Sequence, residues 1–223
     1  YLEDCTAKIT AEYEARGEKV LNIPIGGQAP IGSAGYIQAI PEIMRQMKEQ
    51  NIHADYLVAG YGSTGTFAGL WAGAQYYHAP FEIIGIPIEP DMRPIEETVD
   101  FINEMSDTFE LGIQCKKEDI HLELGEGENF YGGVGYNEPD HITQRYIELL
   151  ARTDAIFTDP CYTGKVLHGF VDLLEKGIIP ADANAIFLHT GGAPGLWTKE
   201  HLDSINEVYW KDEKADHVTN WSM

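Results

Sequence analysis

Basic residues are scarce in this chain of 223 residues, which has 15 Lys and Arg against 36 Asp and Glu and a net charge of −21. Binding to the phosphates of a nucleic acid requires clustered Lys and Arg side chains, so we expect no nucleic acid partner. The acidic surface favours solubility but does not specify a fold. An anionic ligand must therefore be held by a local arrangement, such as converging backbone N–H groups, and not by the overall charge.

Cysteines and long apolar runs are rare as well. Cys5, Cys115 and Cys161 are odd in number and far apart, which argues against a disulfide framework and favours a reducing cytoplasm. Neither they nor the histidines have metal-ligand spacing, so no metal site is expected. No apolar run approaches the roughly 18 residues of a membrane span, and no signal peptide is recognisable. The chain opens on Tyr1 in place of Met, so we expect further residues upstream.

Two kinds of apolar segment alternate along the chain, whose hydrophobic content of 43% is sufficient for a core. Short runs typical of buried strands fall at 20–25, 56–59, 82–88, 120–124, 155–157 and 185–189. Helical segments are expected at 8–17, 32–50, 67–77, 94–115, 139–152 and 163–176. The alternation predicts an α/β fold, a three-layer sandwich with a mostly parallel twisted sheet and helices on both faces. In such sheets ligands bind beyond the C-terminal ends of the strands.

The strongest local signal is the glycine-rich sequence Gly60–Thr66, between a predicted strand and a predicted helix. Glycines allow backbone N–H groups to converge on an anion, and the N-terminus of the following helix adds a favourable potential. Ser63, Thr64 and Thr66 add hydroxyl donors. We therefore expect a phosphate group here, although a tight turn without a ligand would show the same residues.

The same residues also satisfy a dinucleotide-binding pattern, Gly-x-Gly-x-x-Gly, through Gly60, Gly62 and Gly65. Glu89 ends the following strand, where an acidic residue can bind a ribose. A NAD-type oxidoreductase domain is therefore an alternative interpretation. No Lys follows the glycines, so the sequence is not a Walker A loop.

Three further motifs are expected at the same edge of the sheet or near it. Thr190 ends the last predicted strand before two glycines, and its hydroxyl can bond a ring nitrogen without adding a charge. Tyr162 lies in the strand-to-helix connection 158–165, and Tyr136 ends the glycine-rich stretch 131–136. A tyrosine hydroxyl with a shifted pKa can act as an acid or a base. Taken singly, each motif is better explained by packing or by a glycine turn.

Together the motifs resemble one family of enzymes. They are the segments 23–27 with 32–36, 60–70, 159–165 and 188–194. In this order and spacing they resemble the second half of D-cysteine desulfhydrase and 1-aminocyclopropane-1-carboxylate (ACC) deaminase, which have the tryptophan-synthase-β type of fold (fold type II). The resemblance covers about residues 20–197. It implies that residues 1–22 are the remnant of a small domain or crossover and that residues 23–223 form the cofactor-binding large domain.

The resemblance implies pyridoxal phosphate as cofactor, a small amino acid as substrate and a homodimer. The residues it places at the cofactor phosphate are Gly60, Gly62, Ser63, Thr64, Gly65 and Thr66. It places Thr190 at the pyridine nitrogen, with Tyr162 and Tyr136 near the ring as an acid or base. Thr163 occupies the cofactor-side position where the deaminase branch carries Glu. Thr163 therefore favours the desulfhydrase branch, which converts D-cysteine to pyruvate, ammonia and sulfide by β-elimination.

The sequence departs from the family pattern at three short turns. Asn137 follows Tyr136 where the family has Gly, which puts the shape of that loop in doubt. Gln28 and Ala29 replace a usual Ser-Asn pair. Thr64 replaces the third residue of the usual Gly-Ser-Gly-Gly sequence.

The largest departure is an absence. The lysine that forms the Schiff base in this family belongs to an upstream Asn-Lys motif, and a Ser-Asn motif for the substrate carboxylate also lies upstream. Neither motif occurs in these 223 residues, and we predict that Lys165 is a surface residue. The chain is therefore expected to be a fragment whose missing N-terminal segment carries the lysine. A non-catalytic binding domain is the other interpretation that this absence allows.

Overall fold

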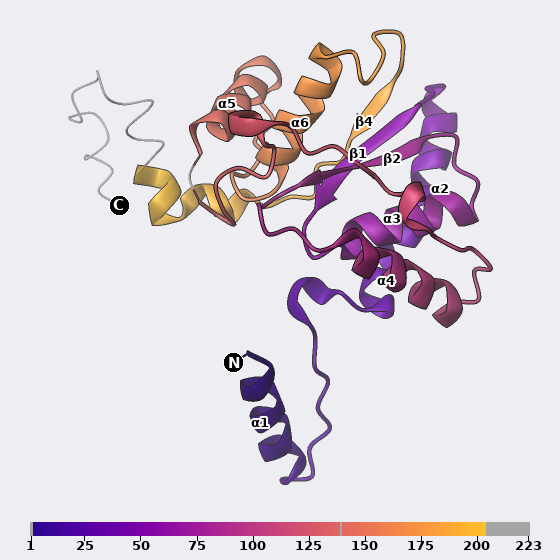
Figure 1. Ribbon diagram of the computed structural model, residues 1–223, viewed down its shortest axis with the longest axis vertical. Helices are drawn as coiled ribbons and strands as arrows, with labels where there is room; N and C mark the ends of the chain where they lie inside the picture. Colours follow the sequence, from indigo (N-terminus) through magenta and orange to yellow (C-terminus); the bar gives the residue numbers. More distant parts are fainter. Residues whose placement is uncertain (1, 139, 204–223) are drawn as a thin grey trace.

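The computed structural model describes residues 2–138 and 140–203 (Figure 1). Its sheet contains β1 (Tyr56–Tyr61), β2 (Glu82–Pro87), β3 (His121–Leu122) and β4 (Ala185–Phe187). The strand order is β3-β2-β1-β4, and each of the three pairings is parallel. The predicted parallel sheet is therefore confirmed.

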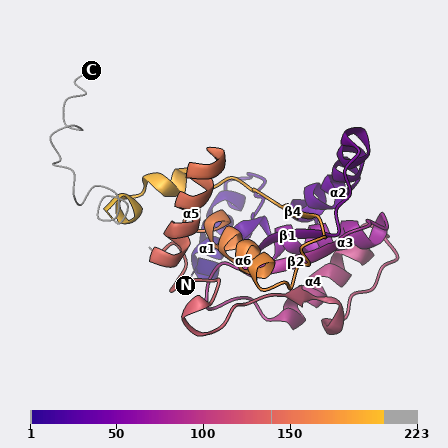
Figure 2. The same cartoon turned by 90° about the horizontal axis from the view of Figure 1, so that it is seen from above.

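Helices cover both faces of the sheet, as the alternation of segments predicts. The helices are α1 (Leu2–Glu14), α2 (Pro30–Gln50), α3 (Gly65–Tyr76), α4 (Ile95–Thr108), α5 (His141–Asp154) and α6 (Thr163–Glu175). Figures 1 and 2 show α2, α3 and α4 on one side of β1 and β2, and α5 and α6 on the other. α1 lies apart from the sheet (Figure 1). No described helix is both long and apolar enough to cross a membrane.

The central strands are apolar on both sides because helices bury both of their faces. In β1, Leu57, Ala59 and Tyr61 join a cluster with α2, α3 and α4, whereas Val58 joins a cluster with α6. All four side chains are fully buried. Continuous apolar runs of this kind are typical of parallel strands covered by helices on both faces.

Two predicted strands are wrong. Residues 20–24 have no regular structure and pair with none of the described strands, and Ile23 is 76% exposed. Residues 155–157 also lack a strand partner. Ala155 takes a left-handed φ of 57° at the end of α5, and Phe157 is 61% exposed. Apolar β-branched and aromatic residues indicate a strand only where the fold supplies a partner backbone.

Two predicted helices have different ends. α4 stops at Thr108 instead of 115, because Glu110 and Gly112 take left-handed φ values of 53° and 67°. α5 begins at His141, because the Asp140 carboxylate caps it by accepting the N–H groups of the helix's second and third residues at 3.0 and 3.3 Å.

α2 and α3 pack closely because α3 presents two glycines to α2. A Cβ on Gly69 would lie 2.6 Å from the carbonyl oxygen of Ser33, and one on Gly73 would lie 2.7 Å from that of Ile37. These distances leave no room for a methyl group. The contact therefore fixes α3, and with it the turn at the N-terminus of α3.

Gly73→Ala should lower the free energy of unfolding by about 1–3 kcal/mol, because the added methyl group forces α2 away from α3. Gly35→Ala is the matched control, since Gly35 is an exposed helical glycine with no atom within 4 Å of its Cβ position. The control should raise stability by up to about 1 kcal/mol through helix propensity. Urea denaturation measures both changes, and equal effects of the two substitutions would contradict the packing argument.

Candidate functional site

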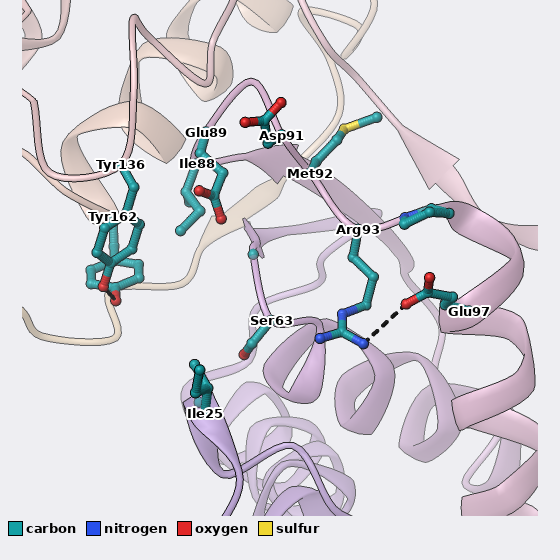
Figure 3. Close-up of a pocket in the computed structure, with 13 residues that line it drawn as sticks. Ile25, Ser63, Ile88, Glu89, Asp91, Met92, Arg93, Glu97, Tyr136 and Tyr162 are labelled. Atoms are coloured by element: carbon teal, nitrogen blue, oxygen red, sulfur yellow. Dashed lines mark hydrogen bonds and ion pairs between the residues drawn. The ribbon is translucent and has the colours of Figure 1, made fainter. Parts of the chain in front are cut away.

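A cleft of about 430 Å³ opens at the C-terminal edge of the sheet (Figure 3). Its walls are the turn after β1, the segment that follows β2, and two tyrosines from later loops. The turn contributes Gly62 and Ser63, the segment after β2 contributes Glu89 and others, and the tyrosines are Tyr136 and Tyr162. This is the position at which parallel α/β sheets bind ligands.

The turn between β1 and α3 depends on an unusual conformation of Thr64. Thr64 is buried and takes a left-handed φ of 71° just before the first residue of α3. Its hydroxyl accepts a hydrogen bond from Nε2 of Gln28 at 3.2 Å. A left-handed β-branched residue costs about 1–2 kcal/mol, which explains why a glycine is usual at this position of the family pattern. The turn keeps its shape although Thr replaces Gly.

The residues at this turn fit a phosphate group. The first N–H groups of α3 have no partners within the helix, and the helix dipole favours an anion there. The backbone of Gly26 lies close to the side chain of Ser63, because a Cβ on Gly26 would lie 2.3 Å from Oγ of Ser63. Oγ of Ser33 is buried without a hydrogen-bond partner among the described residues, 3.2 Å from the Cβ position of Gly65. These donors are uncharged, and the cleft's Arg93 is paired with Glu97 at 3.1 Å.

The six residues predicted for the phosphate do not all reach the cleft. Gly62 and Ser63 line it, and Ser63 points into it in Figure 3. Gly60 lies within β1 instead, with its Cβ position 3.3 Å from Val166 of α6. Of the others, Thr64 and Gly65 are buried and Thr66 is half-buried in the first turn of α3.

Tyr136 and Tyr162 meet at the cleft wall opposite Ser63 (Figure 3). Their hydroxyl groups are hydrogen-bonded, and their ring centroids are 5.7 Å apart at an interplanar angle of 80°. Burial and the hydrogen bond to Tyr136 raise the pKa of Tyr162. The hydrogen bond with Tyr162 lowers the pKa of Tyr136, but burial and the nearby Cys161 and Glu89 outweigh this effect, so the pKa of Tyr136 is raised as well. Both hydroxyls therefore keep their protons at neutral pH, which suits donors better than bases.

The buried Asp159 carboxylate holds the turn that carries Tyr162. It accepts the N–H groups of Cys161, Tyr162 and Thr163 at 2.8, 2.8 and 2.7 Å. It also accepts the hydroxyl of Thr163 at 2.7 Å. The sequence analysis assigned no role to this residue, although an Asp before a Pro is a turn signal.

The Thr163 hydroxyl joins this turn to the end of β4. It donates to Asp159, accepts the N–H of Asp159 at 2.9 Å, and lies 3.4 Å from the carbonyl oxygen of Gly191. The structure thus brings together the connection 158–165 and the segment 188–194, which the sequence analysis expected at the same edge of the sheet. Thr190 precedes Gly191 and is exposed, but it does not line the cleft.

Lys165 is not a surface residue, and that prediction is wrong. Its side chain is fully buried, and Nζ donates to the carbonyl oxygens of Ile88 and Gly135, both at 2.7 Å. The spacing of Lys165, Gly169 and Leu173 in α6 puts all three on the face turned to the sheet. Gly169 and Leu173 do pack on the core, so this periodicity was a usable signal.

The loop that carries Tyr136 keeps a conformation that glycine favours. Asn137 takes a left-handed φ of 56°, and Asn is, after Gly, among the residues that most readily adopt this region. Its Oδ1 is 3.1 Å from Nε2 of His201. The replacement of the family's Gly by Asn is therefore compatible with this left-handed backbone.

A polar network ties the start of the same loop to α6. Asp172 accepts hydrogen bonds from the Tyr131 hydroxyl at 2.5 Å and Nδ2 of Asn129 at 3.1 Å, and it pairs with Lys176 at 2.6 Å. Nε2 of His168 donates to Oδ1 of Asn129 at 2.8 Å. Burial lowers the pKa of His168, which keeps the ring neutral within the core.

The fold and the cleft place the chain among α/β proteins with a ligand-sized site at the C-terminal edge of a parallel sheet. The sequence profile of the family described as pyridoxal-phosphate dependent enzymes matches residues 1–191. The chain belongs to that family. This match decides between the two cofactors considered for Gly60–Thr66 in favour of pyridoxal phosphate.

Relatives from two named groups of enzymes are similar to the chain. A putative ACC deaminase of Pyrococcus abyssi is 30% identical over 190 residues, which are 85% of this chain and 55% of the relative. A D-cysteine desulfhydrase of Yersinia enterocolitica is 34% identical over 191 residues, 86% of this chain and 56% of the relative. The chain thus spans about half the length of the curated relatives it matches.

Solved structures agree with these sequence relatives. The crystal structure of an ACC deaminase homologue has a TM-score of 0.80 and 27% identity, over 92% of this chain and 59% of the other. An O-ureido-L-serine synthase has a TM-score of 0.50 and 15% identity, over 84% of this chain and 53% of the other, and shares the fold. The predicted fold type II architecture is therefore confirmed.

Asp159→Asn should lower the free energy of unfolding by about 3 kcal/mol, because an amide nitrogen would face buried N–H donors that have no other acceptor. Asp55→Asn is the matched control, because Asp55 also accepts a backbone N–H, that of Asn184 at 2.8 Å, but is partly exposed. The control should cost less than about 1 kcal/mol. Urea denaturation compares them, and a cost at Asp159 no larger than that of the control would contradict its role.

The pKa values of His168 and His201 are lowered in the folded chain. The free energy of unfolding should therefore fall as the pH drops from about 7 through 6.5, because the unfolded chain then binds protons at these histidines and the folded chain does not. His168→Gln should make this dependence shallower between about pH 7 and 5, since one of the two histidines with a lowered pKa is then lost, while His121, whose raised pKa acts in the opposite direction, is unchanged. His141→Gln, at a side chain that is 90% exposed, is the control. Urea denaturation over the pH range measures the slopes, and an unchanged slope for His168→Gln would show that His168 is not buried as described.

Proposed function

We propose that the intact protein is a pyridoxal-phosphate dependent lyase that acts on a small amino acid, with β-elimination from D-cysteine to pyruvate, ammonia and sulfide as its reaction. The observation that carries this proposal is the cleft in which the anion-binding turn faces the Tyr136–Tyr162 pair. The family match and the D-cysteine desulfhydrase relatives support it.

The cofactor would be held at its phosphate end by the turn after β1. The N–H groups at the start of α3 would bind the phosphate, together with the hydroxyl of Ser63. Thr190 lies three residues after β4 and outside the residues that line the cleft, and the family resemblance alone suggests that it would face the pyridine nitrogen. Pyridoxal phosphate supplies electron withdrawal from the α-carbon of a bound amino acid, and the protein fixes the orientation of the groups around it.

The tyrosine pair would hold and deliver a proton. The two hydroxyl groups are hydrogen-bonded to each other, and either can be the donor. Raised pKa values keep both hydroxyls protonated near neutral pH. The pair, whose two members both line the cleft, would therefore protonate a leaving group such as a thiolate and pass a proton between its two hydroxyls.

ACC deamination is the second candidate, because the relative from Pyrococcus abyssi and the solved homologue carry that name. Thr163 argues against it, because its hydroxyl is committed to Asp159 and Gly191 and cannot supply the carboxylate that the deaminase branch has there. Assays with both substrates separate the two reactions.

Ser63→Ala should weaken the binding of pyridoxal phosphate by about tenfold, the effect of losing one hydrogen bond to a charged group. Binding of pyridoxal, which lacks the phosphate, should change little. Fluorescence titration of the chain with each compound measures the difference. An equal loss for both compounds would place the phosphate away from this turn.

The intact protein, expressed with its upstream reading frame, should release pyruvate from D-cysteine, and Tyr162→Phe should lower kcat by about a hundredfold through the loss of proton transfer. Tyr56→Phe, at the start of β1 and away from the cleft, is the control. Pyruvate release is followed by a coupled assay. Unchanged turnover by Tyr162→Phe would remove the tyrosine pair from the reaction, and turnover of ACC alone would favour the second candidate.

A further inference from the structure

Lys165 is a fully buried lysine that the proposed reaction does not use. Its ammonium donates to two backbone carbonyl oxygens, those of Ile88 and Gly135, each at 2.7 Å. Burying a charge is costly even when it is hydrogen-bonded, and an apolar side chain of the same length often gives a more stable core. The retention of a lysine here therefore needs a reason other than core stability.

The two acceptors belong to two different walls of the cleft. Ile88 immediately precedes Glu89 in the segment after β2, and Gly135 immediately precedes Tyr136. One ammonium group on α6 thus links the end of a central strand to the loop that carries a tyrosine hydroxyl. These bonds are anchored on a rigid helix that packs on the sheet.

The loop runs directly over the lysine and against the segment after β2. A Cβ on Gly133 would lie 3.2 Å from Cε and 3.4 Å from Nζ of Lys165. A Cβ on Gly132 would lie 2.9 Å from the carbonyl group of Glu89. The loop therefore rests on the lysine side chain and on Glu89, and without the ammonium the two carbonyl oxygens would need a new donor.

Lys165 makes all of its observed hydrogen bonds as a donor to backbone. Burial lowers the pKa of Lys165, and Cys161 and the carboxylates of Asp140, Glu89 and Asp159 offset only part of this shift. Its nitrogen is not among the atoms of the cleft wall, and both of its observed bonds are to backbone. Lys165 is thus placed to hold the backbone and not to react with a cofactor.

We propose that Lys165 is a positioning residue that fixes Tyr136 against Tyr162 by tying Gly135 to Ile88. Its effect on turnover rests on the proposed function, whereas its effect on the tyrosine pair does not. The resulting order is local, because α6 and β2 are held independently by the core. The lysine thus determines where the Tyr136 hydroxyl lies in the cleft.

Lys165→Met in the chain tests this placement, with Ser106→Ala as the matched control. Ser106 is also buried and donates to a backbone carbonyl oxygen, that of Ile113 at 2.7 Å, but it lies in α4. In the tyrosine-labelled chain, nuclear Overhauser contacts between the rings of Tyr136 and Tyr162 should be present, retained in Ser106→Ala and lost in Lys165→Met. Retention of the ring contacts in a folded Lys165→Met would overturn the proposal.

The unsubstituted chain offers a second measurement, which does not depend on the folding of a variant. In a chain labelled with ¹⁵N at lysine Nζ, the Lys165 ammonium should give a signal near neutral pH with hydrogen exchange about tenfold or more slower than that of the exposed lysines, because its hydrogens are bonded and buried. Exchange as fast as that of the exposed lysines would overturn the proposal.

In the intact enzyme, Lys165→Met should lower kcat by about a hundredfold, the cost of misplacing a reacting group by about 1 Å, while KM changes by less than about threefold. A rise in KM with unchanged kcat would overturn the assigned role. If the unsubstituted enzyme turns over no amino acid, the proposed function fails, and the ring contacts and ammonium exchange still decide the positioning.

Discussion

The C-terminal edge of the sheet is held together by two buried charged side chains that bind backbone groups. Asp159 collects the N–H groups of the turn before α6, and Lys165 collects the carbonyl oxygens of Ile88 and Gly135. Both belong to a single segment of eight residues, 158–165. Because irregular backbone cannot be buried without hydrogen-bond partners, these two side chains are what allow three connections to meet at one cleft.

The C-terminal edge of the sheet offers local donors for an anion in a chain that is strongly negative overall. A chain with a net charge of −21 repels anions at long range, so a phosphate needs local donors that outweigh the field. The turn after β1 supplies them as helix N–H groups and hydroxyls, in a conformation that Thr64 maintains despite its left-handed backbone. Close packing of α3 on α2 through Gly69 and Gly73 then keeps the turn fixed relative to the sheet.

Much of the fold was predictable from the sequence, because periodicity reports burial. The apolar runs at 56–59 and 82–88 give the two central strands, and the glycines of 60–66 mark the turn from β1 into α3. The runs at 20–25 and 155–157 have the same composition but no adjacent strand, and the sequence of a segment does not show whether a partner lies beside it. The ends of α4 and α5 depended on left-handed residues and a cap, which periodicity does not report.

The candidate site was predicted in its chemistry more than in its contacts. Ser63, Tyr136 and Tyr162 do share one cleft, but the hydroxyl of Thr163 binds Asp159 within the turn. Asp159 and Lys165 were overlooked because buried charges look like surface residues in a sequence.

A crystal structure of the chain with pyridoxal phosphate tests the central claim most directly. The phosphate oxygens should lie within hydrogen-bond distance of the N–H groups of residues 62–65, whereas a phosphate bound by Arg93 or outside this cleft would contradict the account.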